Sequence, residues 1–319
     1  MLRVGTIGAG GTGRAHTACL AKIEDAQIVG IADVDLSRAK ALVDQHGGKA
    51  FPDFRELLAQ GLDAVHICTP PHLHEEEVIA AAEAGTHIFL EKPIALDLGA
   101  ADRMLEACHA HKVQLQIGFV LHYFPAFKKV RDVFAAGEIG ELVAVWISRM
   151  GWGPGKEGWI ADPAMSGGMT VEFAAHDLDW LRWVGGEART VYGKNYWARG
   201  YGIEDHIWAL LTFEKGCGFI GDSWASTIGR NDIGVIGTQG AVICDVRGEV
   251  RMKKVEGDEQ VLPLEDIPDG FLAEDTDFVR CVQSGQPVPN GGETGRAALE
   301  LSLAIQESSR TGKVIELPM

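Results

Sequence analysis

A glycine-rich loop near the start of the chain is the first feature with clear chemistry. Gly8, Gly10 and Gly13 have the spacing G-x-G-x-x-G and stand between an apolar run and a helical pattern. Glycines at this spacing let the backbone approach a pyrophosphate, and the N-terminus of the following helix attracts its negative charge. We expect Gly11 and Thr12 to contribute to the same site. The loop predicts a dinucleotide-binding site, and a strand-to-helix turn without a cofactor is the alternative.

An acidic residue stands where a dinucleotide site requires one. Asp33 ends the second predicted strand, about 20 residues after Gly13. Its carboxylate can accept hydrogen bonds from ribose hydroxyls and would repel a 2′-phosphate, which favours NAD over NADP as the cofactor. Val34 follows directly and is assigned to the same site, and Arg38 could partly offset the preference for NAD. In the alternative interpretation, Asp33 only caps the next turn.

Two further loops follow predicted strands at the same edge of the sheet. Thr69, Pro70 and His74 lie in one loop, and Glu91 and Lys92 lie in the other. We assign all five to the nicotinamide half of the cofactor site. An ammonium there could bind a substrate hydroxyl and stabilise developing alkoxide charge, whereas the alternative is a solvated Glu91/Lys92 surface pair. His72 and His74 form a pair in the first loop, but they have no Cys, Asp or Glu partner at ligand spacing, so we predict no metal site.

A stripe of ionisable side chains is predicted on an otherwise apolar helix. Glycines bracket the segment Met169–Val184, which indicates one helix. At about 100° per residue, Glu172, His176 and Asp179 fall within about 60° of one another. His176 is the candidate general acid/base, and Glu172 is close enough to influence its tautomer and pKa. The alternatives are a core histidine satisfied by a neighbouring carboxylate and a metal site formed by all three residues.

Composition and charge limit the classes of function. The chain of 319 residues carries 29 Lys and Arg against 45 Asp and Glu, for a net charge of −16. This sign disfavours binding to nucleic acid or to anionic membranes. No run of about 18 apolar residues and no signal peptide is visible. Six scattered cysteines without a C-x-x-C pair indicate reduced thiols in a cytoplasmic protein.

The first part of the chain has the pattern of a doubly wound parallel sheet. Short apolar runs alternate with amphipathic stretches between residues 2 and 116. The predicted strands are Arg3–Ile7, Gln27–Ala32, Ala64–Cys68, His87–Leu90 and Val113–Gln116. The predicted helices are Thr12–Ile23, Leu36–His46, Phe54–Gln60, His74–Ala84 and Leu98–His111. We therefore predict an NAD-binding Rossmann domain over residues 1–120.

The second part of the chain has a different composition. All eight tryptophans and all four tyrosines follow residue 120. Apolar runs separated by short turns indicate antiparallel strands at Leu142–Ser148, Thr190–Trp197, His206–Phe213, Cys217–Trp224, Ile233–Ile236 and Ala241–Asp245. A helix at Arg296–Arg310, together with the helix at Met169–Val184, should cover one face. We predict an α+β domain with an open, mainly antiparallel sheet over residues 121–319, serving substrate binding and oligomerisation.

These motifs together resemble the glucose-fructose oxidoreductase / inositol dehydrogenase (Gfo/Idh/MocA) family. The matching segments run almost end to end: GAGGTGRAH at 8–16, ADVDLSRA at 32–39, CTPPHLH at 68–74, EKPIAL at 91–96, SGGMTVEFAAHDLDWLRWVGG at 166–186 and SSRTGKVIEL at 308–317. The resemblance implies oxidation of a secondary alcohol of a sugar or cyclitol, or reduction of the ketone, with a nicotinamide cofactor.

The resemblance also implies roles for individual residues. Lys92 matches the lysine of the family's E-K-P loop, and His176 matches its catalytic histidine. Glu172 stands at a position usually held by Asp, and Asp179 matches the acidic residue three positions after the histidine. The run at 121–123, Leu-His-Tyr, departs from the Arg-Arg-aromatic run common in the family, so substrate contacts from that loop do not transfer to this chain.

The leading hypothesis is reversible hydride transfer, in which His176 removes the hydroxyl proton and Lys92 holds the reacting oxygen. Two alternatives stay open: an NAD-dependent glycoside hydrolase that oxidises its substrate transiently, and a catalytically silent NAD-binding sensor. A sensor would need only the glycine loop, so Lys92 and the stripe count against it. Because an open sheet face is normally covered, we expect a homodimer or homotetramer through that sheet.

Overall fold

The computed structural model describes residues 1–153, 155–245, 248–267 and 269–319. The chain divides into two compact units, one formed by residues 1–120 with 269–296 and the other by residues 121–268 with 297–319. Each unit therefore contains two separate parts of the chain. The second domain expected from the sequence, residues 121–319, differs from this division because residues 269–296 belong to the first unit.

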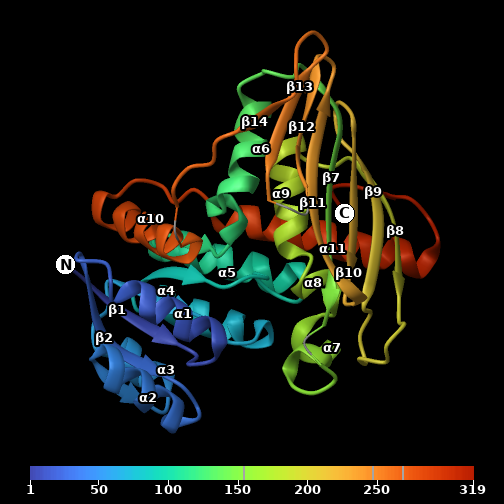
Figure 1. Ribbon diagram of the computed structural model, residues 1–319. Helices are drawn as coiled ribbons and strands as arrows, with labels where there is room; N and C mark the ends of the chain where they lie inside the picture. Colours follow the sequence, from blue (N-terminus) through green and yellow to red (C-terminus); the bar gives the residue numbers. More distant parts are fainter. Residues whose placement is uncertain (154, 246–247, 268) are drawn as a thin grey trace. The chain divides into compact units, whose positions relative to one another are not determined.

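The first unit is built on a parallel sheet of six strands (Figure 1). The strands lie in the spatial order β3-β2-β1-β4-β5-β6, and every neighbouring pair is parallel. Their bounds are β1 (Leu2–Ile7), β2 (Ala26–Ala32), β3 (Lys49–Phe51), β4 (Ala64–Ile67), β5 (His87–Leu90) and β6 (Leu115–Ile117). The predicted Rossmann fold is confirmed, with β3 as an additional edge strand too short for a periodic signal.

The helices of residues 1–120 begin and end close to their predicted positions. They are α1 (Gly11–Leu20), α2 (Leu36–His46), α3 (Phe54–Leu58), α4 (His74–Glu83) and α5 (Leu98–His111), with a short 3-10 helix η1 (Pro71–Leu73) before α4. The side chains of Asp35, Asp53 and Asp97 accept hydrogen bonds from first-turn N–H groups of α2, α3 and α5. These capping residues stand directly before the stretches with helical apolar periodicity. The two signals therefore mark the same helix starts, and the sequence predicts them well.

Helix α10 (Gly270–Ser284) completes the first unit and is absent from the sequence predictions. Its N-cap is Asp269, whose carboxylate accepts hydrogen bonds from two N–H groups of the first turn. Phe278 and Val279 enter the core that contains Val4 and Phe89. Helix α10 packs against α1. The first unit thus takes part of its core from a segment far along the chain.

The second unit is built on a mixed sheet of nine strands, in the order β14-β13-β12-β11-β7-β10-β9-β8-β15. The pair β7 and β10 is parallel, and the other neighbouring pairs are antiparallel. The bounds are β7 (Leu142–Trp152), β8 (Thr190–Tyr196), β9 (His206–Thr212), β10 (Cys217–Ser223), β11 (Ala225–Gly237), β12 (Gly240–Cys244), β13 (Val250–Lys254), β14 (Gln260–Leu262) and β15 (Ile315–Glu316). The predicted open, mainly antiparallel sheet is confirmed.

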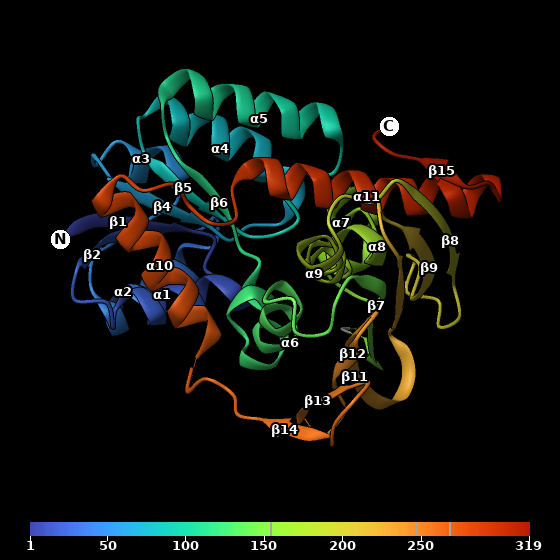
Figure 2. The ribbon, with the colours of Figure 1, turned by 90° about the horizontal axis from the view of Figure 1, so that it is seen from above.

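Helices cover one face of this sheet. Helices α6 (Pro125–Ala135) and α9 (Ala175–Gly185) lie against it (Figure 2). Trp180 of α9 is fully buried, and its ring meets that of Phe127 edge-on, with centroids 6.0 Å apart. The remaining elements are η2 (Val120–Tyr123), η3 (Trp159–Ala161), α7 (Pro163–Ser166), α8 (Met169–Glu172) and α11 (Gly292–Thr311). The core of the second unit therefore lies between these helices and the sheet.

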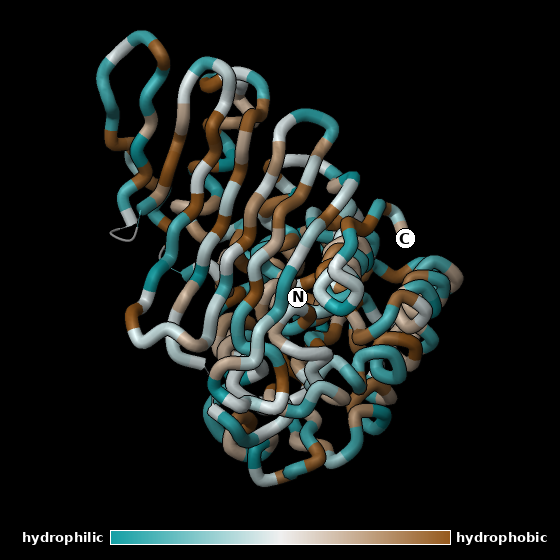
Figure 3. Tube along the Cα trace, turned by 90° about the vertical axis from the view of Figure 1, so that its right-hand side faces the viewer, coloured by the Kyte–Doolittle hydropathy of each residue, from teal (hydrophilic) through white to brown (hydrophobic). Residues whose placement is uncertain are grey.

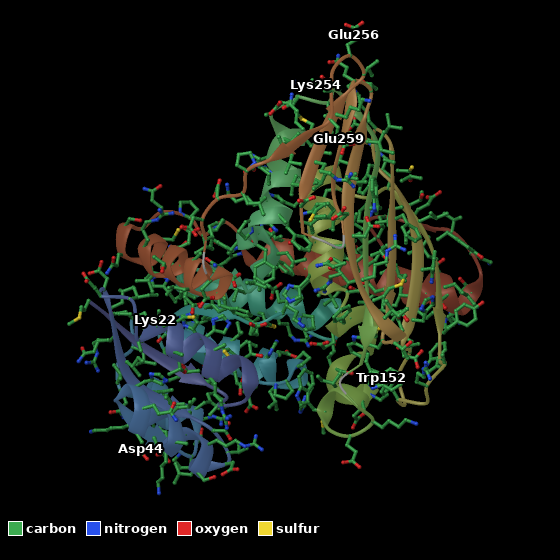
Figure 4. The ribbon with its side chains drawn as sticks, viewed as in Figure 1. Lys22, Asp44, Trp152, Lys254, Glu256 and Glu259 are labelled. Carbon is green, nitrogen blue, oxygen red and sulfur yellow. The ribbon has the colours of Figure 1, made fainter. Side chains whose placement is uncertain are left out.

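Charged side chains stand at several exposed turns and helix ends. Figure 4 shows Lys254, Glu256 and Glu259 around the turn between β13 and β14, and Lys22 and Asp44 on the surface of the first unit. Among the described residues, no helix combines the length and the apolar character that a membrane span needs.

Candidate active site

The glycine loop has the close contacts that its spacing predicts. A Cβ atom on Gly13 would lie 1.8 Å from the carbonyl oxygen of Gly8, so α1 can approach β1 only without a side chain there. Gly8 itself has a φ of +90°, which favours glycine. At Gly10 and Gly11 a Cβ would meet no atom within 4 Å. The loop therefore leaves open space over its backbone, where a pyrophosphate fits.

Asp33 is fixed by the backbone around it. One carboxylate oxygen accepts the N–H of Ala9 at 2.7 Å, and the other accepts the N–H of Asp35 at 2.8 Å. These bonds tie the end of β2 to the glycine loop and hold the carboxylate in place. Val34 beside it is 97% exposed, and the Arg38 guanidinium lies 3.3 Å from the Asp35 carboxylate. Arg38 thus has an acidic partner of its own.

The loop after β4 is supported from within. His74 is fully buried, with Nε2 2.9 Å from the carbonyl oxygen of Thr69 and Nδ1 3.0 Å from that of Pro93. Burial lowers the pKa of His74, against the opposing effect of these carbonyl groups. The Thr69 hydroxyl donates to the carboxylate of Glu77 in α4. The neutral His74 ring therefore lies between the carbonyl groups of two loops and donates its single N–H to one of them. Its direct contact with a cofactor stays a prediction, as it does for Thr69 and Pro70.

Lys92 follows β5, at the sheet edge that also carries the glycine loop after β1. Its neighbour Glu91 is only 9% exposed. One Glu91 oxygen lies 2.9 Å from Nε2 of His16, and the other accepts the backbone N–H of Lys92 at 3.1 Å. The interpretation of Glu91 and Lys92 as a solvated surface pair is therefore wrong, because the Glu91 carboxylate is buried and hydrogen-bonded.

The predicted helix at Met169–Val184 is broken in the structure. Helix α8 ends at Glu172 and helix α9 begins at Ala175, so the prediction of one continuous helix is wrong, although Phe173 and Ala174 between them keep right-handed helical dihedral angles. The common stripe of Glu172, His176 and Asp179 stays a prediction. Glu172 closes the short helix and is buried, whereas His176 lies in the first turn of α9 and is half-buried. The glycines that bracket the segment predicted its ends correctly, but they carry no signal for an internal break.

Asp179 is held by side chains of the second unit. It is 1% exposed, and one of its oxygens lies 2.6 Å from Nε2 of His122 in η2. The His122 ring stacks on Trp183 with centroids 3.8 Å apart, and Arg182 lies 3.9 Å from the other oxygen. Asp179 therefore links α9 to the segment before α6. Its participation in catalysis stays a prediction.

A buried ion network beneath α9 is missing from the sequence predictions. Arg149 of β7 places Nε 2.7 Å from one carboxylate oxygen of Asp177 and 2.9 Å from the other, and its backbone N–H donates to Asp222 at 2.9 Å. Both aspartates are fully buried. Burial and the Asp177 charge raise the pKa of Asp222 well above its usual range, against the opposing effect of Arg149. The network anchors the residue next to His176 to the sheet.

Glu204 is also missing from the sequence predictions, and it holds the start of α8. Its carboxylate accepts the backbone N–H of Thr170 at 3.0 Å and the amide of Asn195 at 3.5 Å, and it also accepts the Thr170 hydroxyl at 2.5 Å. Glu204 is 5% exposed. A carboxylate at a helix N-terminus satisfies N–H groups that lack helical partners. Only the pairing of distant segments reveals this contact, because Glu204 lies in a polar stretch without periodicity.

Comparison with known protein families identifies the relationship. Residues 2–119 match the model of an oxidoreductase family with an NAD-binding Rossmann fold, and residues 127–243 match the Gfo/Idh/MocA C-terminal domain. The myo-inositol 2-dehydrogenase of Thermotoga maritima is 31% identical over 99% of this chain and 98% of its own length. The chain belongs to the Gfo/Idh/MocA oxidoreductase family.

Further family members and a solved structure agree over the whole length. The inositol 2-dehydrogenase of Rhizobium meliloti is 29% identical over 96% of both chains. The crystal structure of a probable dehydrogenase from Thermotoga maritima superposes with a TM-score of 0.87 at 30% identity, covering 99% of both chains. This member of the family is therefore an NAD-dependent oxidoreductase, as the sequence predicted.

Proposed function

We propose that the protein oxidises a secondary alcohol of a cyclitol or sugar, or reduces the corresponding ketone. The observation that carries this proposal is the placement of the glycine loop, Asp33 and Lys92 after strands β1, β2 and β5 of one parallel sheet, at its carboxyl edge. Ligands of open α/β sheets bind at that edge. The relatives named above are dehydrogenases of a cyclitol, which supports the substrate class.

The residues of the first unit fit a dinucleotide. The open space over Gly10 and Gly11 admits a pyrophosphate, and the Asp33 carboxylate is fixed where it can accept ribose hydroxyls. NAD, when bound, supplies the hydride acceptor or donor. Because Arg38 is paired with Asp35, the preference for NAD over NADP rests on Asp33. In an Asp33→Ser variant the dissociation constants for NAD and NADP should lie closer together, and their ratio measures this change.

The proposed catalytic residues are Lys92, His176 and Glu172. The Lys92 ammonium binds the reacting oxygen and stabilises its negative charge. The His176 imidazole takes the hydroxyl proton during oxidation and returns it during reduction. Glu172 binds substrate or sets the tautomer of His176, and Asp179 supports the same segment through His122.

Activity assays test this function directly. The protein is incubated with NAD and a panel of cyclitols and sugars while NADH absorbance is followed. NADH that accumulates in proportion to a polyol supports the proposal. Release of an aglycone without net NADH would indicate the glycoside hydrolase instead, and NAD binding without turnover across the panel would indicate the sensor. The relatives named above, which are dehydrogenases, lend support to neither alternative.

A double-mutant cycle tests whether Lys92 and His176 act on the same reacting group. His176→Ala should lower kcat by about 10² to 10⁴-fold. If both residues act in one transition state, the double variant with Lys92→Ala should lose much less than the product of the two single effects. His111→Ala and Lys112→Ala are matched controls on the exposed end of α5 and should leave kcat unchanged. Near-normal turnover of His176→Ala would remove this residue from the mechanism.

We also propose that two copies of the chain associate through the outer face of the nine-stranded sheet. Paired register positions place Tyr192, Leu210, Phe219 and Trp146 in one row across β8, β9, β10 and β7. Tyr192 is 45% exposed and Leu210 is 61% exposed. Figure 3 looks onto the strands of the sheet, along which hydrophobic stretches alternate with polar ones. A contiguous apolar face of this kind is normally covered in solution, and a homodimer or homotetramer is the simplest cover.

Sedimentation of charged variants tests the association. Leu210→Glu should shift the protein to a smaller species, because it places a charge in the centre of the row. Val255→Glu at the β13–β14 turn, where Val255 is 77% exposed, is the matched control. A wild-type chain that sediments as a monomer would contradict the proposal.

The cysteines support a place in the cytoplasm. All six are free, and four of them, Cys19, Cys108, Cys244 and Cys281, are buried as thiols. A reducing compartment keeps such thiols intact.

A further inference from the structure

A cluster of buried ionisable side chains lies behind the loop that carries Lys92, inside the first unit. His16 comes from α1, His66 from β4 and Asp275 from α10, and all three are fully buried. Glu91, directly before Lys92, joins them. Such groups are costly to bury unless they are paired and hydrogen-bonded, so their arrangement calls for a function or a compensating structure.

His16 connects two carboxylates. Its Nδ1 lies 2.8 Å from Oδ1 of Asp275, and its Nε2 lies 2.9 Å from Oε1 of Glu91. Ionised carboxylates only accept hydrogen bonds, so both ring nitrogens of His16 donate and the ring is an imidazolium. The second oxygen of Glu91 accepts the backbone N–H of Lys92. Contacts therefore run without interruption from Asp275 through His16 and Glu91 to the Lys92 amide.

The neighbouring groups agree with this protonation state. Nε2 of His66 lies 3.2 Å from the same Asp275 oxygen, and its Nδ1 has no hydrogen-bond partner among the described residues. Burial lowers the pKa of His66, which keeps it neutral. Burial also lowers the pKa of His16, but the Asp275 and Glu91 carboxylates more than offset this and raise it well above its usual range. Despite burial, His16 and His66 hold the pKa of Asp275 below its usual range.

Aromatic rings and two cysteine thiols lie near this network. The ring of Phe89 lies 4.9 Å from that of His16 between centroids, a distance suited to a cation over an aromatic ring. Phe271 of α10 meets the same ring edge-on at 5.3 Å. Burial raises the pKa of the Cys19 thiol to about 12 and that of Cys68 well above its usual range, so both stay uncharged.

A metal ion is the other use for such a cluster. His16, His66 and Asp275 offer ligand atoms within 4.8 Å of one another. Ligands around a tetrahedral metal with bonds of about 2.0–2.1 Å stand about 3.3 Å apart. The 2.8 Å contact between His16 and Asp275 is shorter than that and fits a hydrogen bond. The geometry favours the proton-linked arrangement.

We propose that His16 is a positioning residue for Lys92, acting through the Glu91 carboxylate, with Asp275 as its buried counter-charge. The proposal rests on the proposed role of Lys92 as the group that binds the reacting oxygen. A carboxylate held by His16 on one oxygen and by the Lys92 amide on the other cannot rotate, so the start of the lysine's side chain is fixed. Displacing a catalytic group by about 1 Å costs on the order of 10²-fold in rate.

Two substitutions of His16 separate the two hydrogen bonds. The amide of His16→Gln places a donor near the former Nε2 and keeps the bond to Glu91, whereas His16→Asn keeps only a donor near Nδ1, toward Asp275. We expect His16→Asn to lower kcat about 10²-fold with unchanged NAD affinity, and His16→Gln to retain most of the activity. His66→Asn is the matched control, because His66 contacts Asp275 but not Glu91. Equal losses in His16→Asn and His66→Asn would overturn the proposal.

Nuclear magnetic resonance tests the same contacts without any turnover. With ¹⁵N-lysine labelling, the Lys92 amide signal should move in His16→Asn and stay in place in His66→Asn. With ¹⁵N-histidine labelling of the wild type, both ring nitrogens of His16 should remain protonated at pH 8. An unmoved Lys92 amide, or a neutral His16 ring at that pH, would overturn the proposal. If these signals behave as expected while no polyol is oxidised, the proposed function fails and the positioning contact stands.

Discussion

The sheet edge of the first unit and the α8–α9 segment of the second fix their reactive side chains in different ways. Asp33 is held by two backbone N–H groups, and the glycine loop is held by the approach of α1 to β1. By contrast, the start of α8 depends on Glu204, and α9 is anchored through Arg149 of β7. The first arrangement is made by the backbone of consecutive elements. The second is made by side chains that come from distant strands, so single substitutions should affect the two regions differently.

The glycine loop should show the largest effect. In Gly13→Ala the new Cβ meets the Gly8 carbonyl oxygen, and the backbone has to move. We expect NAD affinity to fall by more than about 10²-fold and the free energy of unfolding to fall by about 3 kcal/mol or more. Gly10→Ala is the control for the fold, since its Cβ meets no protein atom within 4 Å. Calorimetry of NAD binding and thermal unfolding measure both effects; equal unfolding temperatures for the two variants would contradict the packing argument.

The second largest effect is expected in the α8–α9 segment, for a substitution of Glu204. Glu204→Ala leaves the Thr170 N–H and hydroxyl without their acceptor in a buried place, whereas the Asn195 amide keeps its bond to the Thr170 hydroxyl oxygen. We expect a loss of about 3 kcal/mol in the free energy of unfolding, together with a fall in kcat because Glu172 ends the same short helix. Glu214→Ala on the surface, where the Glu214 side chain is 82% exposed, should change neither. Urea unfolding followed by activity assays tests both; a stable Glu204→Ala would contradict the clamp.

A carboxyl group of the first unit should make stability depend on pH. Burial raises the pKa of Glu77 from 4.5 to about 7, against the bond from Thr69. Because the folded-state pKa is raised, its contribution to stability is complete below pH 4.5 and is lost as the pH rises through 7. A rise of about 2.5 units corresponds to about 3 kcal/mol. Relative to the wild type, Glu77→Gln should therefore gain up to about 3 kcal/mol between pH 5 and pH 8, measured by urea unfolding; a constant difference would contradict the shift.

The buried aspartate pair of the second unit should show the smallest effect. Burial and the Asp177 charge raise the pKa of Asp222, which favours the protonated acid, and Asp222→Asn then replaces a neutral acid by a neutral amide of the same shape. We expect a change of less than about 1 kcal/mol in the free energy of unfolding. Asp177→Asn should cost more, because it removes the charge that pairs with Arg149. Equal losses in the two variants would indicate that Asp222 is ionised.

This contrast explains how much the sequence could predict. The glycine loop, Asp33 and the helices of residues 1–120 follow from local spacing, periodicity and caps, and the structure places them as expected. The break after Glu172 leaves no local signal, because Phe173 and Ala174 continue the apolar pattern of a helix. Glu204, Arg149 and Asp222 are recognised only when their partners are known. Helix α10 has an amphipathic pattern, but its place beside α1 depends on a core that only the folded first unit presents.

The late position of α10 in the chain has a consequence for biosynthesis. When residue 120 leaves the ribosome, the nascent first unit lacks Asp275, the acidic partner of His16, and it lacks the apolar cover from Phe278. Roughly half of the chain must still be translated, which takes on the order of ten seconds. During that interval the apolar surface that Phe278 and Val279 later cover is exposed, so a chain truncated before α10 should be less stable than the full chain.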